Sequence, residues 1–160
     1  MSFEDLVREH AAALFRYAYW LARDRQQAED VVQEALLRGW RAFPRLRERA
    51  AAKAWLYSIV RNEHFRAVGR KPPPAESVDE ELPDERDSPA DLEIREALLA
   101  LPPSYAEPLA LQVLGGFSCA EIASLLELTE GAVMTRLTRA RQALRRMMAP
   151  AAAKSTGGRA

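Results

Sequence analysis

The 160-residue sequence has few of the side chains that metal and redox sites require. It contains a single cysteine, Cys119, and two histidines, His10 and His64, which lie far apart in the chain. One cysteine cannot form an internal disulfide bond, and the histidines do not have the spacing of zinc ligands. No catalytic type of partner stands near them in the sequence. We therefore expect no metal, no cofactor and no active site.

Long apolar runs are also missing. The N-terminal segment carries acids where a secretory signal would have a basic segment followed by an apolar run, and no stretch of roughly 18 uncharged apolar residues occurs. This pattern predicts a protein that stays in the cytoplasm. A hydrophobic content of 48% in a chain of this length is enough for one ordinary domain or two very small ones.

The chain has no net charge, but its charges are unevenly distributed. Residues 1–71 contain 14 basic and 9 acidic side chains, a net charge of +5. Residues 72–96 contain 2 basic and 10 acidic side chains, and residues 97–160 contain 7 and 4, so their net charges are −8 and +3. Two basic bodies flanking an acidic segment are compatible with nucleic-acid binding, which the overall charge alone would argue against.

Proline and acid content divides the chain into parts. Residues 72–89 begin with three prolines, are rich in acids and show no apolar periodicity, so they cannot bury enough surface to offset the entropy of ordering. We expect this segment to be a flexible linker between domains at 1–71 and 90–149. Residues 150–160 are expected to form a disordered tail.

The first domain shows helical periodicity and no strand signals. Ser2 and Asp5 have the spacing of a capping box for a helix that continues to about Ala22, and Asp24 begins a second helix that Pro44 ends. A third helix is expected from about Ala50 to Gly69. The apolar stripes that would face the core are Ala28, Val31, Val32, Ala35, Leu36, Trp40 and Phe43 on the second helix, and Trp55, Leu56, Ile59, Val60 and Val68 on the third.

The second domain has four expected helices. The segment Ser88–Asp91 starts one that reaches Leu101, and Pro103 starts the next, which ends before the glycine pair at 115–116. Pro108 should remove one hydrogen bond from this helix and bend it, although its position near the helix start limits the cost. Ser118 and Glu121 form a capping box for a short helix over 119–126, and Thr129 caps the last helix, which ends near Met148.

The last two expected helices have the spacing of a helix-turn-helix, whose second helix enters the DNA major groove. The shared core would consist of Ile122, Leu125, Leu128, Val133 and Leu137. The outward positions of the second helix are Glu130, Met134, Thr135, Thr138 and Arg141, with Arg136, Arg139, Arg145 and Arg146 adding positive charge for phosphates. Glu127 occupies a turn position where glycine is common, so strain or another conformation is expected there.

Three segments in this order resemble extracytoplasmic-function (ECF) sigma factors of the sigma-70 family: Ala28–Trp40, Ala54–Asn62 and Val133–Arg141. The resemblance covers almost everything except the linker and the tail. It implies an all-α protein of two small helical domains, sigma region 2 and a region 4 helix-turn-helix. Its partners would be core RNA polymerase, promoter DNA and an anti-sigma factor.

The resemblance also implies where core polymerase binds. In the family, an acid, a glutamine and another acid on one helix face dock on the clamp helices of the largest subunit, and Asp30, Gln33 and Glu34 match them. Positions three and four apart are neighbours on a helix, so the spacing supports a shared face. Without the family, these residues would more often form an ordinary solvated face.

The loop and third helix of the first domain resemble the part of the family that captures a flipped base of the minus-ten element. Leu46 and Asn62 match the pocket positions, and Arg61 and Arg66 would lie beside the strand. Leucine replaces a frequent aromatic residue, which weakens the wall against which an unstacked base packs. The cationic track for the separated strand would comprise Arg45, Arg47, Arg49, Lys53, Arg61, Arg66, Arg70 and Lys71.

In the second domain, the resemblance directs Met134, Thr135 and Thr138 toward bases of the minus-thirty-five element. Arg136, Arg139 and Arg141 would contact the backbone or neighbouring groups. The family often has a cation where Met134 stands, and a methionine cannot donate a hydrogen bond to guanine. We therefore expect a preferred element different from that of relatives with a basic residue there.

Two other kinds of protein are compatible with parts of this pattern. A conventional helix-turn-helix regulator would dimerise and bind an operator without polymerase, and the segment around Asp30, Gln33 and Glu34 argues against it. A small helical enzyme would need a nucleophile–base pair or a metal site, which the sequence does not offer.

Overall fold

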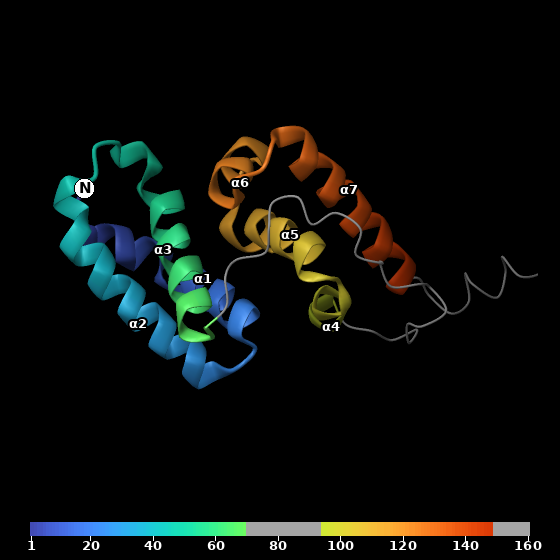
Figure 1. The fold of residues 1–160 in the computed structure, drawn as a ribbon, viewed down its shortest axis with the longest axis horizontal. Helices are drawn as coiled ribbons and strands as arrows, with labels where there is room; N and C mark the ends of the chain where they lie inside the picture. Colours follow the sequence, from blue (N-terminus) through green and yellow to red (C-terminus); the bar gives the residue numbers. More distant parts are fainter. Residues whose placement is uncertain (70–93, 149–160) are drawn as a thin grey trace, which may run out of the picture.

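A computed structural model describes residues 1–69 and 94–148, and within these ranges every regular element is a helix. The first unit (residues 1–69) contains α1 (Phe3–Ala22), α2 (Arg25–Ala42) and α3 (Ala52–Ala67), with the 3₁₀ turns Phe43–Arg45 and Arg49–Ala51 between α2 and α3. The second unit (residues 94–148) contains α4 (Ile94–Ala100), α5 (Pro103–Gly115), α6 (Cys119–Leu126) and α7 (Glu130–Met147). Figure 1 shows the two units side by side. The all-α prediction is confirmed.

Four of the predicted helix starts have the expected caps. Ser2 and Asp5 exchange hydrogen bonds at the start of α1, and Ser118 and Glu121 do so at the start of α6. Asp24 accepts from the Gln27 backbone N–H at 2.8 Å. The Thr129 hydroxyl likewise accepts from Ala132 N–H at 3.1 Å. Each cap satisfies a backbone donor that has no partner inside its helix.

The two predicted core stripes each contain one error. The Trp40 side chain is 60% exposed, and Val68 is 38% exposed. Gly39, the neighbour of Trp40, faces the core instead, because a Cβ at Gly39 would lie only 3.1 Å from the Phe3 ring. Phe3 thus fills the part of the core that the helical pattern had predicted for Trp40. Val68 follows the last residue of α3 and lies outside the helical face to which we assigned it.

The described part of the chain contains no helix that is both long and apolar enough to cross a membrane. The predicted linker at 72–89, the tail at 150–160 and the helix start at Ser88–Asp91 lie outside the described residues. The proposed domain limits at 71 and 90 fall outside them as well.

The two units are in direct contact. Helix α5 packs against α1 as well as against α4, α6 and α7, and α6 packs against α3. Every residue from Ser104 to Leu111 is buried, so this part of α5 is covered on all sides. The sequence predicted the two units but did not predict that they pack together.

Candidate polymerase- and promoter-binding surfaces

Helix α2 carries an exposed polar face that contains Asp30, Gln33 and Glu34. Its carboxylates are held by side chains one turn away. Gln26 donates to Asp30 Oδ1 at 3.0 Å, and Arg38 Nε lies 3.4 Å from Glu34 Oε1. The structure thus brings the three predicted polymerase-binding residues together on one solvent-facing surface.

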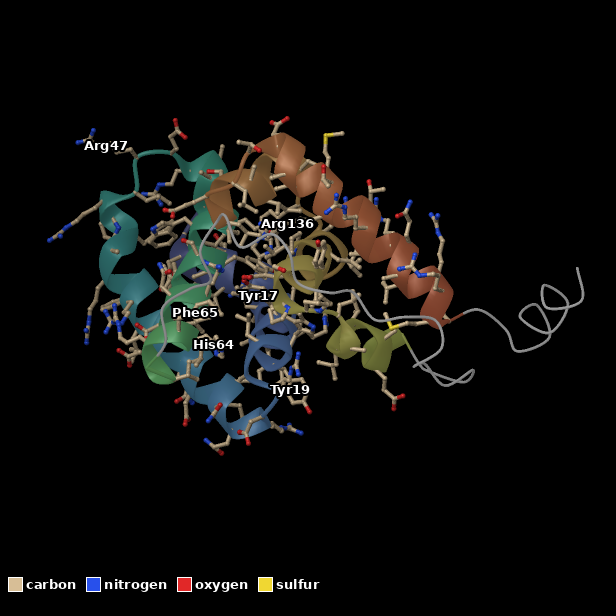
Figure 2. The ribbon with its side chains drawn as sticks, turned by 45° about the vertical axis from the view of Figure 1, so that its right-hand side comes forward. Tyr17, Tyr19, Arg47, His64, Phe65 and Arg136 are labelled. Carbon is tan, nitrogen blue, oxygen red and sulfur yellow. The ribbon has the colours of Figure 1, made fainter. Side chains whose placement is uncertain are left out.

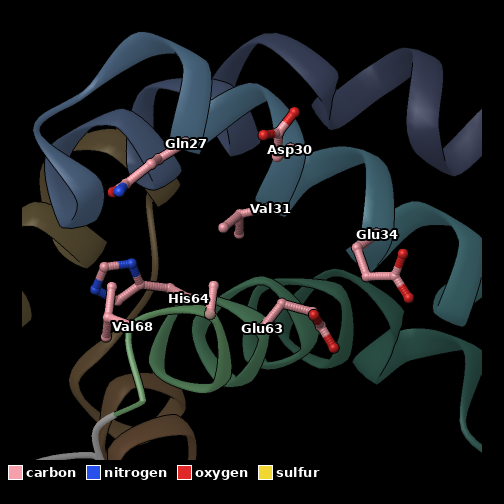
Figure 3. Close-up of a pocket in the computed structure, with 8 residues that line it drawn as sticks. Gln27, Asp30, Val31, Glu34, Glu63, His64 and Val68 are labelled. Atoms are coloured by element: carbon pink, nitrogen blue, oxygen red, sulfur yellow. The ribbon is translucent and has the colours of Figure 1, made fainter.

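A cleft of about 370 Å³ separates this face from α3. Its lining residues are Gln27, Asp30, Val31, Glu34, Glu63, His64, Ala67 and Val68. Figure 3 shows the His64 ring near Gln27 at one end and the Glu34 and Glu63 carboxylates at the other. The cleft joins two of the predicted residues to α3 residues that the sequence did not single out as part of this site.

Glu63 and His64 are buried polar residues at the cleft. Glu63 Oε1 accepts from Arg66 Nη1 at 2.9 Å and forms an ion pair with Arg38, whose Nε lies 2.5 Å away. The Nδ1 atom of His64 is buried without a hydrogen-bond partner. Burial lowers the pKa of His64, with the Glu107 charge opposing and the Arg61 charge adding to the shift. Only the adjacency of an acid and a histidine on an apolar helix could have indicated these residues in the sequence.

The predicted minus-ten residues have different environments. Leu46 is half-buried in the loop between the two 3₁₀ turns and packs against the core, whereas Asn62 is exposed on α3. Arg66 is exposed and paired with Glu63. Arg61 differs from all of these, because its side chain is only 11% exposed and is bound to the second unit.

The contact of Arg61 with the second unit is a buried ion pair with Glu107 of α5. Arg61 Nε lies 2.5 Å from Glu107 Oε1, and Arg61 Nη2 lies 3.5 Å from Oε2. Tyr17 of α1 donates to the same Oε1 atom at 3.1 Å. Burial works to lower the pKa of Arg61, but the Glu107 charge and hydrogen bond raise it above its usual value. Burial and then the Glu107 charge raise the pKa of Tyr17 well above its usual value.

The remaining described residues of the predicted cationic track also differ in their environments. Arg45 and Arg47 are exposed, and Figure 2 shows Arg47 projecting away from the fold. The Arg49 guanidinium lies 4.0 Å from the centre of the Phe43 ring. Lys53 instead contacts the second unit, as described below. Arg70 and Lys71 lie outside the described residues.

The turn before α7 has the conformation that glycine usually supplies. Glu127 has φ 57° and ψ 45°, which is the left-handed region, and its backbone N–H donates to the Ala123 carbonyl. Leu128 N–H donates to the same carbonyl at 2.8 Å. The strain expected at Glu127 is therefore present, and these hydrogen bonds hold the turn in place. The predicted core residues Ile122, Val133 and Leu137 are buried, while Leu125 and Leu128 pack partly buried against them.

Helix α7 exposes most of the predicted minus-thirty-five residues. Met134 is 56% exposed, and Thr135, Thr138 and Arg139 are exposed as well. The Thr138 hydroxyl donates to the Met134 carbonyl at 2.9 Å, so its oxygen is left to accept. Arg141 is exposed and donates to the Gln112 side chain of α5.

Arg136 is the predicted DNA residue that turns inward. It is half-buried and lies between α7 and α5 in Figure 2. Its Nη1 atom is 3.5 Å from the Ser104 carbonyl oxygen. Pro108, four residues after Ser104, has no N–H to donate to that carbonyl. Arg136 therefore supplies a donor that the proline removed from α5. The sequence indicated that Pro108 removes a hydrogen bond, but it did not indicate this compensation.

Comparison with known proteins identifies both units. The model of sigma-70 region 2 matches residues 6–71, and the model of sigma-70 region 4 matches residues 91–144. The ECF RNA polymerase sigma factor SigL of Mycobacterium tuberculosis is 38% identical over 150 residues, which cover 88% of this chain and 85% of SigL.

Two solved structures have a similar fold. The sigma factor RpoE, in complex with the anti-sigma factor NepR from Bartonella quintana, has a TM-score of 0.67 at 27% identity over 91% of this chain and 97% of that one. CnrH, in complex with the cytosolic domain of CnrY, has a TM-score of 0.64 at 26% identity over 89% and 84% of the two chains. The chain therefore belongs to the ECF sigma factors of the sigma-70 family.

Proposed function

We propose that this sigma factor binds core RNA polymerase through the α2 face of Asp30, Gln33 and Glu34. An ECF sigma factor binds the polymerase and directs promoter-specific initiation, so the open question is which residues of this chain make each contact. The observation that supports the proposal most is that all three side chains are exposed on one face of α2, beside a cleft. Two carboxylates flanking an amide fit a partner that presents basic and hydrogen-bonding groups. The clamp helices of the largest subunit are the proposed partner.

The minus-ten element is proposed to contact the loop after α2 and the exposed side of α3. Asn62 would read the edge of an extruded base, and Leu46 would form part of the apolar wall. Arg61 and Arg66 would hold the backbone of the separated strand, in line with their charge. Arg66 is exposed for this role, whereas Arg61 must first leave Glu107.

The minus-thirty-five element is proposed to contact the exposed face of α7. Thr135 and Thr138 can make hydrogen bonds and touch a thymine methyl, whereas Met134 offers apolar contact alone. Arg139 and Arg141 would contact phosphates, with Arg136 at the edge of this surface. The exposure of Met134, Thr135, Thr138 and Arg139 supports this assignment.

An anti-sigma factor is the proposed regulator, because the two structural relatives are each bound to another protein and NepR is named as an anti-sigma factor. Such a partner would cover the polymerase- and DNA-binding faces. We also propose that the chain acts in the cytoplasm, where RNA polymerase works, and that it catalyses no reaction itself. Polymerase would supply the chemistry.

The test of the polymerase site is competition for core enzyme. Replacing both Gln33 and Glu34 by alanine should weaken core binding and reduce transcription in a reconstituted assay on a genomic promoter library. The control is Glu4→Ala with Glu9→Ala, which alters two exposed residues of α1. Circular dichroism should show unchanged helicity in both variants.

If the α2 variant competes for core enzyme as well as the parent does, the assignment of this face is wrong. A conventional operator-binding regulator would instead shift DNA as a dimer in the absence of polymerase. A gel-shift assay with DNA alone separates the two kinds of protein.

A further inference from the structure

Helix α3 uses one face to contact the second unit. Lys53, Tyr57 and Arg61 are four residues apart, so they lie above one another on the same side of the helix. Each of them contacts a residue of the second unit. Lys53 and Arg61 belong to the cationic track proposed for the separated promoter strand. The face that would bind DNA is thus partly occupied by the protein itself.

The centre of the contact is a buried carboxylate with three donors from the first unit. Glu107 is 5% exposed and accepts from Arg61 Nε, Arg61 Nη2 and the Tyr17 hydroxyl. A guanidinium binds a carboxylate and a phosphate with the same planar pair of N–H donors. Glu107 therefore occupies on Arg61 the position that a backbone phosphate would take.

A second contact lies at the C-terminal end of α5. Lys53 Nζ donates to the Gly115 carbonyl and lies 4.6 Å from the centre of the Phe117 ring. A cation at this end of a helix is favoured by the helix dipole. Tyr57 packs edge-on against Phe117, with ring centroids 4.8 Å apart. While this contact is made, the Lys53 ammonium cannot bind a backbone phosphate of the DNA strand.

The contact also contains an unfavourable element. The Tyr57 hydroxyl is buried without a hydrogen-bond partner. A buried polar group that loses its water without gaining a partner destabilises the state that buries it. The Tyr57 ring packs against Phe117, so separation of the two units would remove one of the groups that cover this residue. The packed arrangement is therefore one that a competing ligand can open.

The promoter itself requires separation. Elements named minus-ten and minus-thirty-five are about 25 base pairs apart, which is roughly 85 Å of straight duplex. Compact domains of this size have radii of gyration of about 10–11 Å, so the centres of two units in contact lie on the order of 30 Å apart. The packed units cannot reach both elements at once.

We propose that the free factor is closed, with Glu107 acting as an intramolecular substitute for a promoter phosphate on Arg61. In the closed form, α5 and α6 cover the Lys53–Tyr57–Arg61 face of α3, and binding of a DNA strand to this face competes with the second unit. The inference rests on the proposed DNA role of Lys53 and Arg61. It concerns the factor without polymerase, so it is tested apart from transcription.

The experiment compares Glu107→Gln with Glu96→Gln in the full-length free protein. Glu96 is an exposed glutamate of the same unit and provides the same change in charge. Small-angle X-ray scattering reports the radius of gyration, and fluorescence anisotropy reports binding of a labelled 20-nucleotide single-stranded DNA of random sequence. Glu107→Gln should increase the radius and tighten DNA binding roughly 5- to 150-fold, the range of a typical coupling between sites. Glu96→Gln should change neither.

Tyr57→Phe provides a second variant with the opposite expected effect. It keeps the ring contact with Phe117 but removes the unpartnered hydroxyl, so it should favour the closed form and weaken binding of the same DNA. Thermal melting shows whether each variant is folded. If Glu107→Gln does not fold, the Tyr57→Phe variant still tests the proposal. Added DNA should also expand the parent protein, because coupling is reciprocal.

The proposal is overturned if Glu107→Gln has the radius and DNA affinity of Glu96→Gln, or if it expands without binding DNA more tightly. Tighter DNA binding by Tyr57→Phe would also overturn it. A parent protein that fails to support transcription with core polymerase would count against the proposed function alone, because these measurements contain no polymerase.

Discussion

At the scale of single residues, buried polar groups were the features that the sequence indicated least. Glu107 lies in an otherwise apolar stretch, and a charge that is buried in such a helix requires a partner. That requirement was a usable signal, but the partner, Arg61, is 46 residues away and on another unit. Periodicity identifies the face of a helix, whereas the partner of a buried charge depends on how helices pack.

His64 leads to a prediction about acid stability. Its pKa is lowered in the folded protein, mainly by burial. A histidine with an unfolded-state pKa of about 6.5 and a lower folded-state pKa takes up its proton more readily when unfolded. Folding stability from neutral His64 is therefore present above about pH 6.5 and is lost as pH falls below that value.

His64→Gln should reduce this acid sensitivity. The measurement is the free energy of unfolding by urea at pH 7.5 and pH 5.5, for the parent and the variant. We expect the parent to lose more stability than the variant between the two pH values. His10 also has a pKa lowered by burial. The variant His10→Gln therefore measures how much of the loss of stability at low pH is due to His10. An equal loss in the parent and His64→Gln would contradict the prediction.

At the scale of helices, capping and turn residues made the sequence informative. The four caps at Ser2, Asp24, Ser118 and Thr129 form as predicted, because each depends on a side chain and a backbone N–H only three residues apart. The exposed position of Trp40 was not predicted, since Phe3 takes its place over Gly39 through a contact between distant segments. Local chemistry therefore predicts where helices begin, but only packing decides which large side chain reaches the core.

Helix α7 leads to a prediction about the role of Arg136. Because Arg136 donates to the Ser104 carbonyl, which Pro108 cannot reach with an N–H, Arg136→Met should destabilise the protein by about 0.5–1.5 kcal/mol, the net contribution of one hydrogen bond. Arg139→Met, an exposed control on the same helix, should have little effect. Thermal unfolding of the free factor measures both.

A double-mutant cycle isolates the contact between Arg136 and α5. In a Pro108→Ala background the backbone N–H is restored, so Arg136→Met should cost less there than in the parent. If the cost is the same in both backgrounds, Arg136 does not compensate for the proline.

The exposed face of α7 leads to a prediction about promoter preference. Met134→Arg should shift the selected minus-thirty-five sequence toward guanine at one position, by roughly 1–3 kcal/mol if the new contact is bidentate. Arg139→Ala should instead weaken all promoters about equally and lower the salt dependence, as the loss of a phosphate contact does. Selection from a randomised upstream element with holoenzyme measures both variants.

The opposite outcome would reverse the assignment. If Met134→Arg leaves the selected sequence unchanged and Arg139→Ala alters it, Arg139 is the base-reading residue and Met134 is not.

At the scale of the whole molecule, the length of chain between the units limits how far they can separate. The 24 residues from 70 to 93 can span at most about 80 Å when fully extended. Together with the size of the two units, on the order of 30 Å, this length is sufficient for promoter elements roughly 85 Å apart on straight duplex. The sequence predicted the two bodies and the segment between them from proline and charge alone. Their contact depends on Glu107, Lys53 and Arg61 meeting across that segment, which composition does not reveal.

Deleting 12 residues between positions 72 and 89 should therefore abolish transcription that depends on both elements. The remaining 12 residues reach about 40 Å, and the two units add on the order of 30 Å, which falls short of the promoter spacing. Core binding through α2 should persist, because that face belongs to the first unit. The control replaces the same 12 residues by glycine and serine, which preserves the reach of the chain. Run-off transcription from one promoter compares the three proteins, and equal transcript yield from the shortened chain would show that the units need not separate by this distance.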